Sequence, residues 1–202
     1  MTKIKICGLS RPCDIEYVNE AKPDFCGFII NVPKSKRNVS PDTVRQLVKN
    51  LSPDVKPVGV FVNTPMDEIA ALTEDGTLAY VQLHGKEDEA YIAALREKIH
   101  VPIIQAFKVS CPEDVAHAQK SSADYILLDN GSGGTGKTFD WSHLRDITRP
   151  YILAGGLGPD NLGLAVSQLA PWGVDLSSGV ETDGFKDKNK VLAAVQAVRA
   201  TL

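Results

Sequence analysis

Three side chains that could transfer protons stand at the ends of short apolar runs in this sequence. Cys7, His84 and Asp129 each follow a stretch rich in isoleucine, valine or leucine. Thiol, imidazole and carboxyl groups are the usual general acids and bases of enzymes. The pattern therefore indicates acid–base chemistry, with Cys7 as the candidate base and Asp129 as the candidate acid.

Each of these residues also has a plainer structural interpretation. A lone cysteine is commonly a small buried hydrophobe, so Cys7 could belong to the core. Asp129 could cap a helix or brace a loop, and His84 could orient the loop that follows it. We keep Cys7 and Asp129 as the predicted catalytic pair and assign His84 to substrate binding.

Two further charged residues are candidates for substrate binding. Arg37 lies in a loop after an apolar run, where a guanidinium could grip a carboxylate through two parallel hydrogen bonds. Because Lys34 and Lys36 flank it, a solvated basic loop is the alternative. Asp175, near the end of the last predicted strand, is the second candidate.

Glycine-rich turns follow the last two apolar runs. One contains Gly155 and Gly156, and the other contains Ser178 and Gly179. Either turn alone could simply be tight, because glycine adopts conformations that other residues avoid. Barrel enzymes, however, often bind phosphate through main-chain N–H groups after their last two strands. The two turns together predict a phosphorylated substrate.

The elements that must position these residues are short strands alternating with helical segments. Such alternation is typical of βα units around a parallel sheet. Eight strands are predicted: Lys3–Cys7, Phe25–Ile30, Pro57–Val62, Ala79–Leu83, Pro102–Phe107, Asp124–Asp129, Tyr151–Ala154 and Gly173–Ser177. Eight strands with eight helices predict an α/β fold, a closed (β/α)8 TIM barrel, whose active site lies where the strands end.

Helix starts are predicted from capping residues and prolines. They are Ser40–Pro41, Thr64–Pro65 with Asp67, Ser110 shortly before Pro112, and Asp187. The helix after Asp129 should be the shortest. Because barrels of this type usually take about 250 residues, 202 residues leave room for short loops and one catalytic domain, residues 1–202.

A competing motif lies directly after Asp129. Gly131 to Thr138 reads GSGGTGKT, which matches the P-loop pattern of nucleotide-hydrolysing enzymes. A P-loop normally opens its domain, whereas only two strands are predicted after this one. The following residues also indicate a new helix capped by Asp140. A glycine-rich loop that closes over a substrate would explain the same residues without nucleotide binding.

Composition narrows the class of protein. The net charge of −3 offers no basic surface for nucleic acid, and no apolar run is long enough to cross a bilayer. The first residues read as a strand rather than a signal peptide, so we expect a cytoplasmic protein. Four cysteines are spread without CxxC spacing, so neither a metal site nor a disulfide framework is predicted.

With these residues in view, the sequence resembles the phosphoribosylanthranilate isomerases along nearly its whole length. The resemblance rests on seven blocks in matching order: KICGL from Lys5, GF from Gly27 with SKR from Ser35, VGVFVN from Val58, VQLHG from Val81, LLD from Leu127 with Gly133 to Trp141, AGGL from Ala154, and VDLSSGVE from Val174. Any one block is weak, but the seven together are specific.

The resemblance implies an Amadori rearrangement in tryptophan biosynthesis, with no cofactor. It implies that Asp129 protonates the ribose ring oxygen and that Cys7 removes the C2 proton. It further implies that Arg37 binds the anthranilate carboxylate and that the residues of the two glycine-rich turns bind the phosphate. Asp175 is expected to touch the substrate.

Two alternatives stay open at this point. A related barrel isomerase could act on the histidine-pathway aminosugar phosphate, alone or as a second activity, although that reaction pairs two aspartates. A catalytically silent barrel could bind a phosphorylated ligand without turnover, because a fold does not prove chemistry. The sequence also leaves open a monomer or a homodimer.

Overall fold

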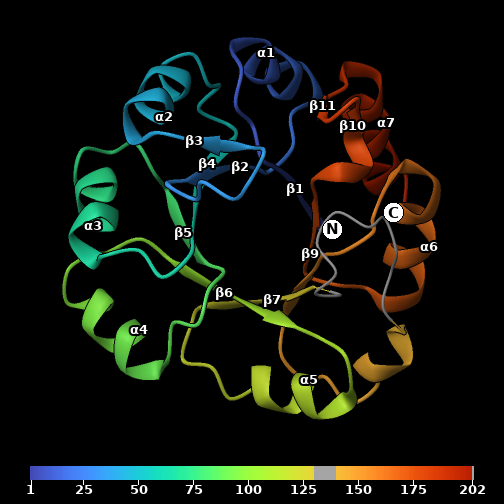
Figure 1. The fold of residues 1–202 in the computed structure, drawn as a ribbon. Coiled ribbons are helices and arrows are strands. Elements are labelled where there is room, and N and C mark those ends of the chain that lie inside the picture. Colours follow the sequence, from blue (N-terminus) through green and yellow to red (C-terminus); the bar gives the residue numbers. More distant parts are fainter. Residues whose placement is uncertain (130–139, 202) are drawn as a thin grey trace.

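Eight parallel strands close into a barrel in the computed structural model, which describes residues 1–129 and 140–201 (Figure 1). Strand β1 pairs with both β2 and β9, which closes the sheet. The barrel strands are β1 (Lys3–Cys7), β2 (Phe25–Ile30), β4 (Lys56–Phe61), β5 (Tyr80–Leu83), β6 (Ile103–Lys108), β7 (Tyr125–Asp129), β8 (Tyr151–Leu153) and β9 (Gly173–Leu176). The predicted barrel is confirmed, and each strand agrees with its predicted bounds to within one residue.

Strand β1 shows how the sequence sets the two faces of the barrel. Successive side chains of a strand point to opposite faces. Ile4 and Ile6 are fully buried in the cluster between the strands and the helices. Lys5 and Cys7 point into the barrel, where they meet polar residues of other strands. The inner face of β1 is therefore reactive and the outer face structural.

Helices surround the barrel as an outer ring (Figure 1). The described α-helices are α1 (Pro12–Ala21), α2 (Pro41–Val48), α3 (Met66–Glu74), α4 (Glu89–Arg96), α5 (Pro112–Ala118), α6 (Pro159–Leu169) and α7 (Lys188–Arg199). The predicted caps Ser40 and Asp187 are confirmed, since each side chain accepts a main-chain N–H of the first turn. Helix α3 is instead preceded directly by Pro65, and α5 by Cys111.

The prediction of eight helices needs one correction. Among the described residues, the segment between β7 and β8 carries a short 3-10 helix, η1 (Trp141–Leu144), in place of an α-helix. The carboxylate of Asp140 accepts a hydrogen bond from the Ser142 N–H at 2.9 Å, so the predicted cap is confirmed. Pro150 lies directly before β8, and because a proline interrupts a helix, a longer helix could not extend through it.

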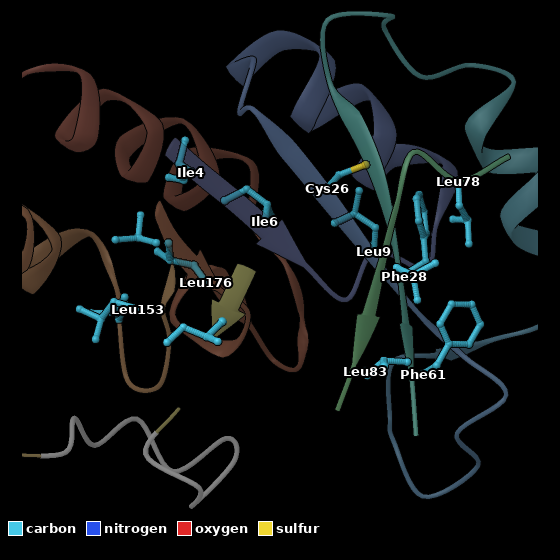
Figure 2. Close-up of a cluster of buried hydrophobic side chains, with 14 of the residues drawn as sticks. Ile4, Ile6, Leu9, Cys26, Phe28, Phe61, Leu78, Leu83, Leu153 and Leu176 are labelled. Atoms are coloured by element: carbon cyan, nitrogen blue, oxygen red, sulfur yellow. The ribbon is translucent and has the colours of Figure 1, made fainter. Parts of the chain in front are cut away.

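Two apolar clusters hold the fold together. The larger one lies between the strands and the helices, and Figure 2 shows part of it, including Ile4 and Ile6 of β1. The smaller cluster includes Phe25, Val58 and Ile104, which come early in their strands. Apolar side chains thus fill the part of the interior near the strand starts, and polar groups are left to the other end.

Short elements complete the rim at the strand ends. Strand β3 (Asn38–Val39) pairs with β2, and β10 (Glu181–Thr182) forms a hairpin with β11 (Phe185–Lys186) after the 3-10 helix η2 (Ser178–Val180). The sequence analysis did not predict these elements. None of the described helices has the length and apolar character that crossing a membrane requires.

Candidate active site

A cavity of about 280 Å³ opens at the carboxyl ends of the barrel strands. It is lined by most of the predicted site residues: Cys7, Arg37, His84, Asp129, Gly155, Gly156, Asp175 and Ser178. Gly179 instead lines an adjoining depression, which shares Gly156 and Ser178 with the cavity. The fold therefore brings together residues that are far apart in the sequence.

Cys7 ends β1 at the floor of this cavity and is 6% exposed. Gly27 on β2 makes room for it, because a Cβ at Gly27 would lie 2.8 Å from the Cys7 sulfur and 3.0 Å from Cε of Lys5. Burial raises the pKa of Cys7, while the positive charges of Lys5 and Lys186 oppose that rise. The thiol is thus buried beside the cations that favour its ionised form.

Lys5 is a buried cation that the sequence analysis did not single out. Its ammonium group donates 2.8 Å hydrogen bonds to Oε1 of Gln82 and to Oδ2 of Asp175. Burial alone would lower the pKa of Lys5. The nearby Asp175 and Cys7 raise it by more than burial lowers it, so the net pKa lies above the usual value. Lys5 is therefore charged at neutral pH.

Asp129 ends β7, and His84 follows β5 on the neighbouring side of the cavity. Nε2 of His84 lies 3.9 Å from Oδ2 of Asp129. Oδ1 of Asp129 and Oδ1 of Asp175 are buried and have no hydrogen-bond partner among the described residues. Because buried polar atoms are normally paired, these oxygens are available to a ligand.

The His84 side chain is 39% exposed, but the protein atoms around its ring desolvate it and lower its pKa, and the nearby carboxylate of Asp129 only partly offsets this. The imidazole is therefore neutral near pH 7 and presents one N–H donor and one acceptor. Its Nδ1 lies 2.9 Å from the side-chain nitrogen of Gln82. His84 is thus tied to the polar interior through Gln82.

Arg37 reaches the rim from the segment before β3 and is held there by the carboxylate of Glu181. Its Nε and one terminal nitrogen each donate a 2.6 Å hydrogen bond to Glu181. The ammonium group of Lys186 also donates to Glu181, and it donates to the Ser177 carbonyl at 3.0 Å. Two cations share one carboxylate, so this side of the cavity keeps a net positive charge.

The pairing of Arg37 with Glu181 was not predicted. Sequence reasoning missed Glu181, Lys186, Lys5 and Gln82 as parts of the site. A signal existed for Lys5, because a lysine two residues before Cys7 falls on the same face of the strand. Nothing in the sequence linked Glu181 to Arg37 across 144 positions.

The two glycine-rich turns, after β8 and after β9, meet beside the cavity. Gly155 and Gly156 have φ values of +88° and +65°, in the left-handed region that favours glycine. A Cβ at Gly179 would overlap the carbonyl oxygen of Leu157, so the turns can approach only if this residue is glycine. The turns thus form a cradle of main-chain atoms after β8 and β9.

Main-chain donors in this cradle are open. Neither Gly155 nor Gly156 donates a main-chain hydrogen bond to another described residue. Ser178 and Gly179 begin η2, and the first N–H groups of a helix have no partner within it. Unpaired N–H groups at a helix start favour an anion. This end of the cavity is suited to a phosphate group.

Potential metal ligands do not cluster in the described part of the chain. Within it, no group of three or more His, Cys, Asp and Glu side chains is placed to hold a metal ion. All four cysteines are free thiols. The P-loop-like segment, residues 131–138, lies outside the described residues.

Comparison with known proteins decides the family. The family model for N-(5′-phosphoribosyl)anthranilate isomerase matches residues 4–197. A relative from Endomicrobium trichonymphae with that name is 45% identical over 204 residues, which cover 99% of this chain and 100% of the relative. This chain belongs to the phosphoribosylanthranilate isomerase family.

Solved phosphoribosylanthranilate isomerases share the whole barrel. The enzyme from Thermotoga maritima matches with a TM-score of 0.89 and 37% identity, over 99% of this chain and 100% of that one. Another, crystallised with reduced 1-(o-carboxyphenylamino)-1-deoxyribulose 5-phosphate, matches with a TM-score of 0.86 and 36% identity, over 99% and 100% of the two chains. Because the family match covers residues 4–197, the family assignment favours the isomerase over the nucleotide-hydrolase alternative.

Proposed function

We propose that this protein isomerises N-(5-phosphoribosyl)anthranilate to 1-(2-carboxyphenylamino)-1-deoxyribulose 5-phosphate in tryptophan biosynthesis. The observation that carries the proposal is one cavity holding Cys7 and Asp129 together with Arg37 and the glycine cradle. A family member with a similar barrel binds a reduced form of that product. The reaction needs one acid, one base and two anion-binding ends.

Asp129 is the proposed acid. The ribose ring opens when its ring oxygen gains a proton and the bond from C1 to that oxygen breaks, which leaves a Schiff base. Oδ1 of Asp129 has no partner among the described residues, so the protonated carboxyl is free to meet that oxygen. A positioned acid of this kind contributes about 100- to 10,000-fold to a rate.

Cys7 is the proposed base. It takes the proton from C2 of the Schiff base, and the electron pair of that bond moves to give an enolamine, which tautomerises to the ketone. The thiolate is required for this step, and burial disfavours it in the empty cavity. Lys5 and Lys186 supply the opposing positive charge, so ionisation of Cys7 depends on these two cations.

The two anionic ends of the substrate are held by separate groups around the cavity. Arg37 binds the anthranilate carboxylate with the N–H groups that Glu181 leaves free, since a guanidinium has five donors. The N–H groups of Gly155, Gly156, Ser178 and Gly179 bind the phosphate. Clamping both anions fixes the ribose between acid and base and so converts binding energy into orientation.

Two further polar groups face the same space and complete the proposed substrate contacts. Asp175 has one oxygen bonded to Lys5 and the other unpaired among the described residues, so it can accept a ribose hydroxyl. His84 lies beside Asp129 and reaches the reacting end. We further propose that residues 1–202 form one catalytic domain that needs no cofactor, as a monomer or a homodimer.

The test is turnover of freshly generated phosphoribosylanthranilate, followed by the loss of its fluorescence. The histidine-pathway aminosugar phosphate is assayed in parallel with the same protein. We expect turnover of the first substrate and little or none of the second. Folded protein that turns over only the second would contradict the proposal, and tight binding of either without turnover would indicate a silent barrel.

A further inference from the structure

A line of hydrogen bonds runs from Lys5 on β1 through Gln82 to His84, which lies beside Asp129. Lys5, Gln82 and His84 come from β1, β5 and the residue after β5. Lys5 and Gln82 are each at most 2% exposed. Water therefore cannot replace the bond between Lys5 and Gln82, whereas the bond from Gln82 to His84 is only partly buried.

Lys5 fixes the orientation of the Gln82 amide. An ammonium group has three donors and no acceptor, so only the carbonyl oxygen of the amide can face it. That oxygen, Oε1, accepts from Lys5 at 2.8 Å. The amide nitrogen of Gln82 must then point the other way, toward Nδ1 of His84 at 2.9 Å.

The Gln82 amide in turn fixes the tautomer of His84. The amide nitrogen is a donor only, so Nδ1 must accept and carries no proton. Partial desolvation by the surrounding protein lowers the pKa of the ring, so it is neutral near pH 7. The single ring proton therefore sits on Nε2, the nitrogen that lies 3.9 Å from Oδ2 of Asp129.

We propose that Lys5 and Gln82 are positioning residues that hold His84 as its Nε2–H tautomer, so that His84 donates to the carboxylate that Asp129 becomes during the reaction. This inference rests on the proposed function, in which Asp129 gives its proton to the ribose ring oxygen. His84 keeps its own proton throughout. It stabilises the charge that appears on Asp129 when the ring opens.

The separation in the empty site fits that role. At 3.9 Å the two atoms are too far apart for a hydrogen bond. Contacts of catalytic groups are often long in an empty site and shorten in the complex. An interaction that strengthens only as charge develops lowers the barrier rather than tightening substrate binding. Loss of the hydrogen bonds from Lys5 through Gln82 to His84 should thus affect kcat far more than KM.

The first experiment measures the tautomer directly in the whole protein. Long-range proton–nitrogen correlation spectra of 15N-histidine-labelled protein show which ring nitrogen carries the proton. Four histidines are present, and the His84→Asn variant identifies the His84 signals. We expect a protonated Nε2 and an unprotonated Nδ1 at pH 7. A proton on Nδ1 in the wild type would overturn the proposal.

Variants of Gln82 then change the tautomer. In Gln82→Glu both side-chain oxygens are acceptors, so we expect the proton to move to Nδ1 or the ring to become doubly protonated. Gln82→Met removes both hydrogen bonds at similar volume. For Gln82→Met, and for Gln82→Glu if the single ring proton has moved to Nδ1, we expect kcat to fall about 10- to 100-fold, the range of a lost hydrogen bond to a charged group, with KM changed less than about 3-fold. A doubly protonated ring in Gln82→Glu keeps its Nε2–H, so in that case we expect kcat to be largely retained.

Gln105→Met is the matched control. Gln105 is also a buried barrel glutamine, but it bonds to the Glu87 carbonyl and to Ser121, away from His84. We expect it to leave the His84 signals and kcat within about 2-fold of wild type, because a lost neutral hydrogen bond acts on stability. An equal fall in kcat for Gln105→Met and Gln82→Met would overturn the proposal.

A double variant separates this inference from the proposed function. Because Gln82 acts through the acid, Gln82→Met should have little further effect when Asp129→Asn is already present. Effects that multiply would overturn the inference. Full wild-type activity in Asp129→Asn would instead overturn the assignment of the acid, while the tautomer measurement would stand by itself.

Discussion

At the residue scale, single charged side chains each bond to two other groups of the site. Glu181 joins Arg37 to Lys186, and Lys5 joins Asp175 to Gln82. Burial raises the pKa of Glu181, but the hydrogen bonds from Arg37 and Lys186 outweigh it and leave that pKa below its usual value. Glu181 therefore stays ionised and keeps the guanidinium of Arg37 in place.

Replacing Glu181 by Gln should weaken binding of the substrate carboxylate. The amide cannot accept both hydrogen bonds of Arg37 and leaves Lys186 without a charged partner. We expect KM to rise about 10-fold or more, because a guanidinium that is not held must be ordered on binding. Steady-state assays of turnover measure this.

The matched control for this variant is Glu20→Gln. Glu20 pairs with Lys188 on the surface, where both side chains are about half exposed, at 53% and 47%. Exposed pairs of this kind contribute little. A KM in Glu181→Gln that stays as low as in Glu20→Gln would contradict the proposed role of the pair.

What the sequence could predict at this scale depends on position. Cys7 and Asp129 were found because each ends an apolar strand, where barrel sites lie. Lys5 and Gln82 lie inside strands, where the sequence analysis sought no function. Glu181 was quoted as part of a family block, but its partner depends on the three-dimensional approach of the segments before β3 and after β9. Long-range pairing of this kind leaves no local pattern.

At the element scale, the phosphate end depends on the close approach of two turns. The turn after β8 and the turn after β9 meet where Gly179 lies against the Leu157 carbonyl. Both turns precede helices, and α6 is capped by Asn161, whose side chain accepts from the Gly158 N–H at 2.9 Å. The geometry of the cradle is therefore set by main-chain packing.

Gly179→Ala should disturb this cradle. The added methyl group would overlap the Leu157 carbonyl, so one of the turns must move. We expect a loss of about 1 to 3 kcal/mol in the free energy of unfolding, the usual cost of overpacking, and a higher KM for the phosphorylated substrate. Urea unfolding and steady-state assays measure the two effects.

Gly163→Ala gives the same chemical change nearby without the overlap. Gly163 lies within α6, and a Cβ there would meet nothing within 4 Å. Alanine in a helix interior is favoured over glycine by about 0.5 to 1 kcal/mol, so this variant should be more stable than wild type. If both variants behaved alike, the close approach at Gly179 would not be the cause.

Elements were predictable where the pattern was local. The eight strands follow from short apolar runs, and α2 and α7 from the caps Ser40 and Asp187. The helix after β7 was predicted to be the shortest, but its 3-10 type was not predicted, because a capping aspartate indicates a start and not a helix type. The hairpin of β10 and β11 was missed because two-residue strands carry no period.

At the scale of the whole molecule, Asp24 ties the barrel seam to the last helix. Its carboxylate accepts from the Lys3 ammonium at 2.8 Å, the Ile4 N–H at 3.0 Å and the Arg199 guanidinium at 2.8 Å. Burial raises the pKa of Asp24, but these donors outweigh it and leave that pKa below its usual value. The ionised form is therefore the one that stabilises the fold.

Asp24→Asn should lower stability at neutral pH but not in acid. The stabilisation from a depressed pKa is present above the unfolded value of about 3.9 and is lost as the pH falls through the folded value. We expect a loss of about 1 to 3 kcal/mol at pH 7 that shrinks below about pH 4. Denaturant unfolding across this range measures it.

Asp67→Asn serves as the control for this pH series. Asp67 pairs with Lys98 on the surface, where the Asp67 side chain is 86% exposed. We expect little change in stability at any pH, because exposed pairs contribute about 0 to 1 kcal/mol. A constant difference between Asp24→Asn and wild type down to about pH 2 would show that ionisation of Asp24 is not the cause.

The most direct test of the acid–base pair is the turnover of phosphoribosylanthranilate by Cys7→Ser and Asp129→Asn. Cys13→Ser, which changes a half-buried thiol on α1, is the control. We predict that kcat falls about 100-fold or more in each site variant and stays near wild type in the control. Activity near that of the wild type in Cys7→Ser or Asp129→Asn, with folded protein, would contradict the assignment of base or acid.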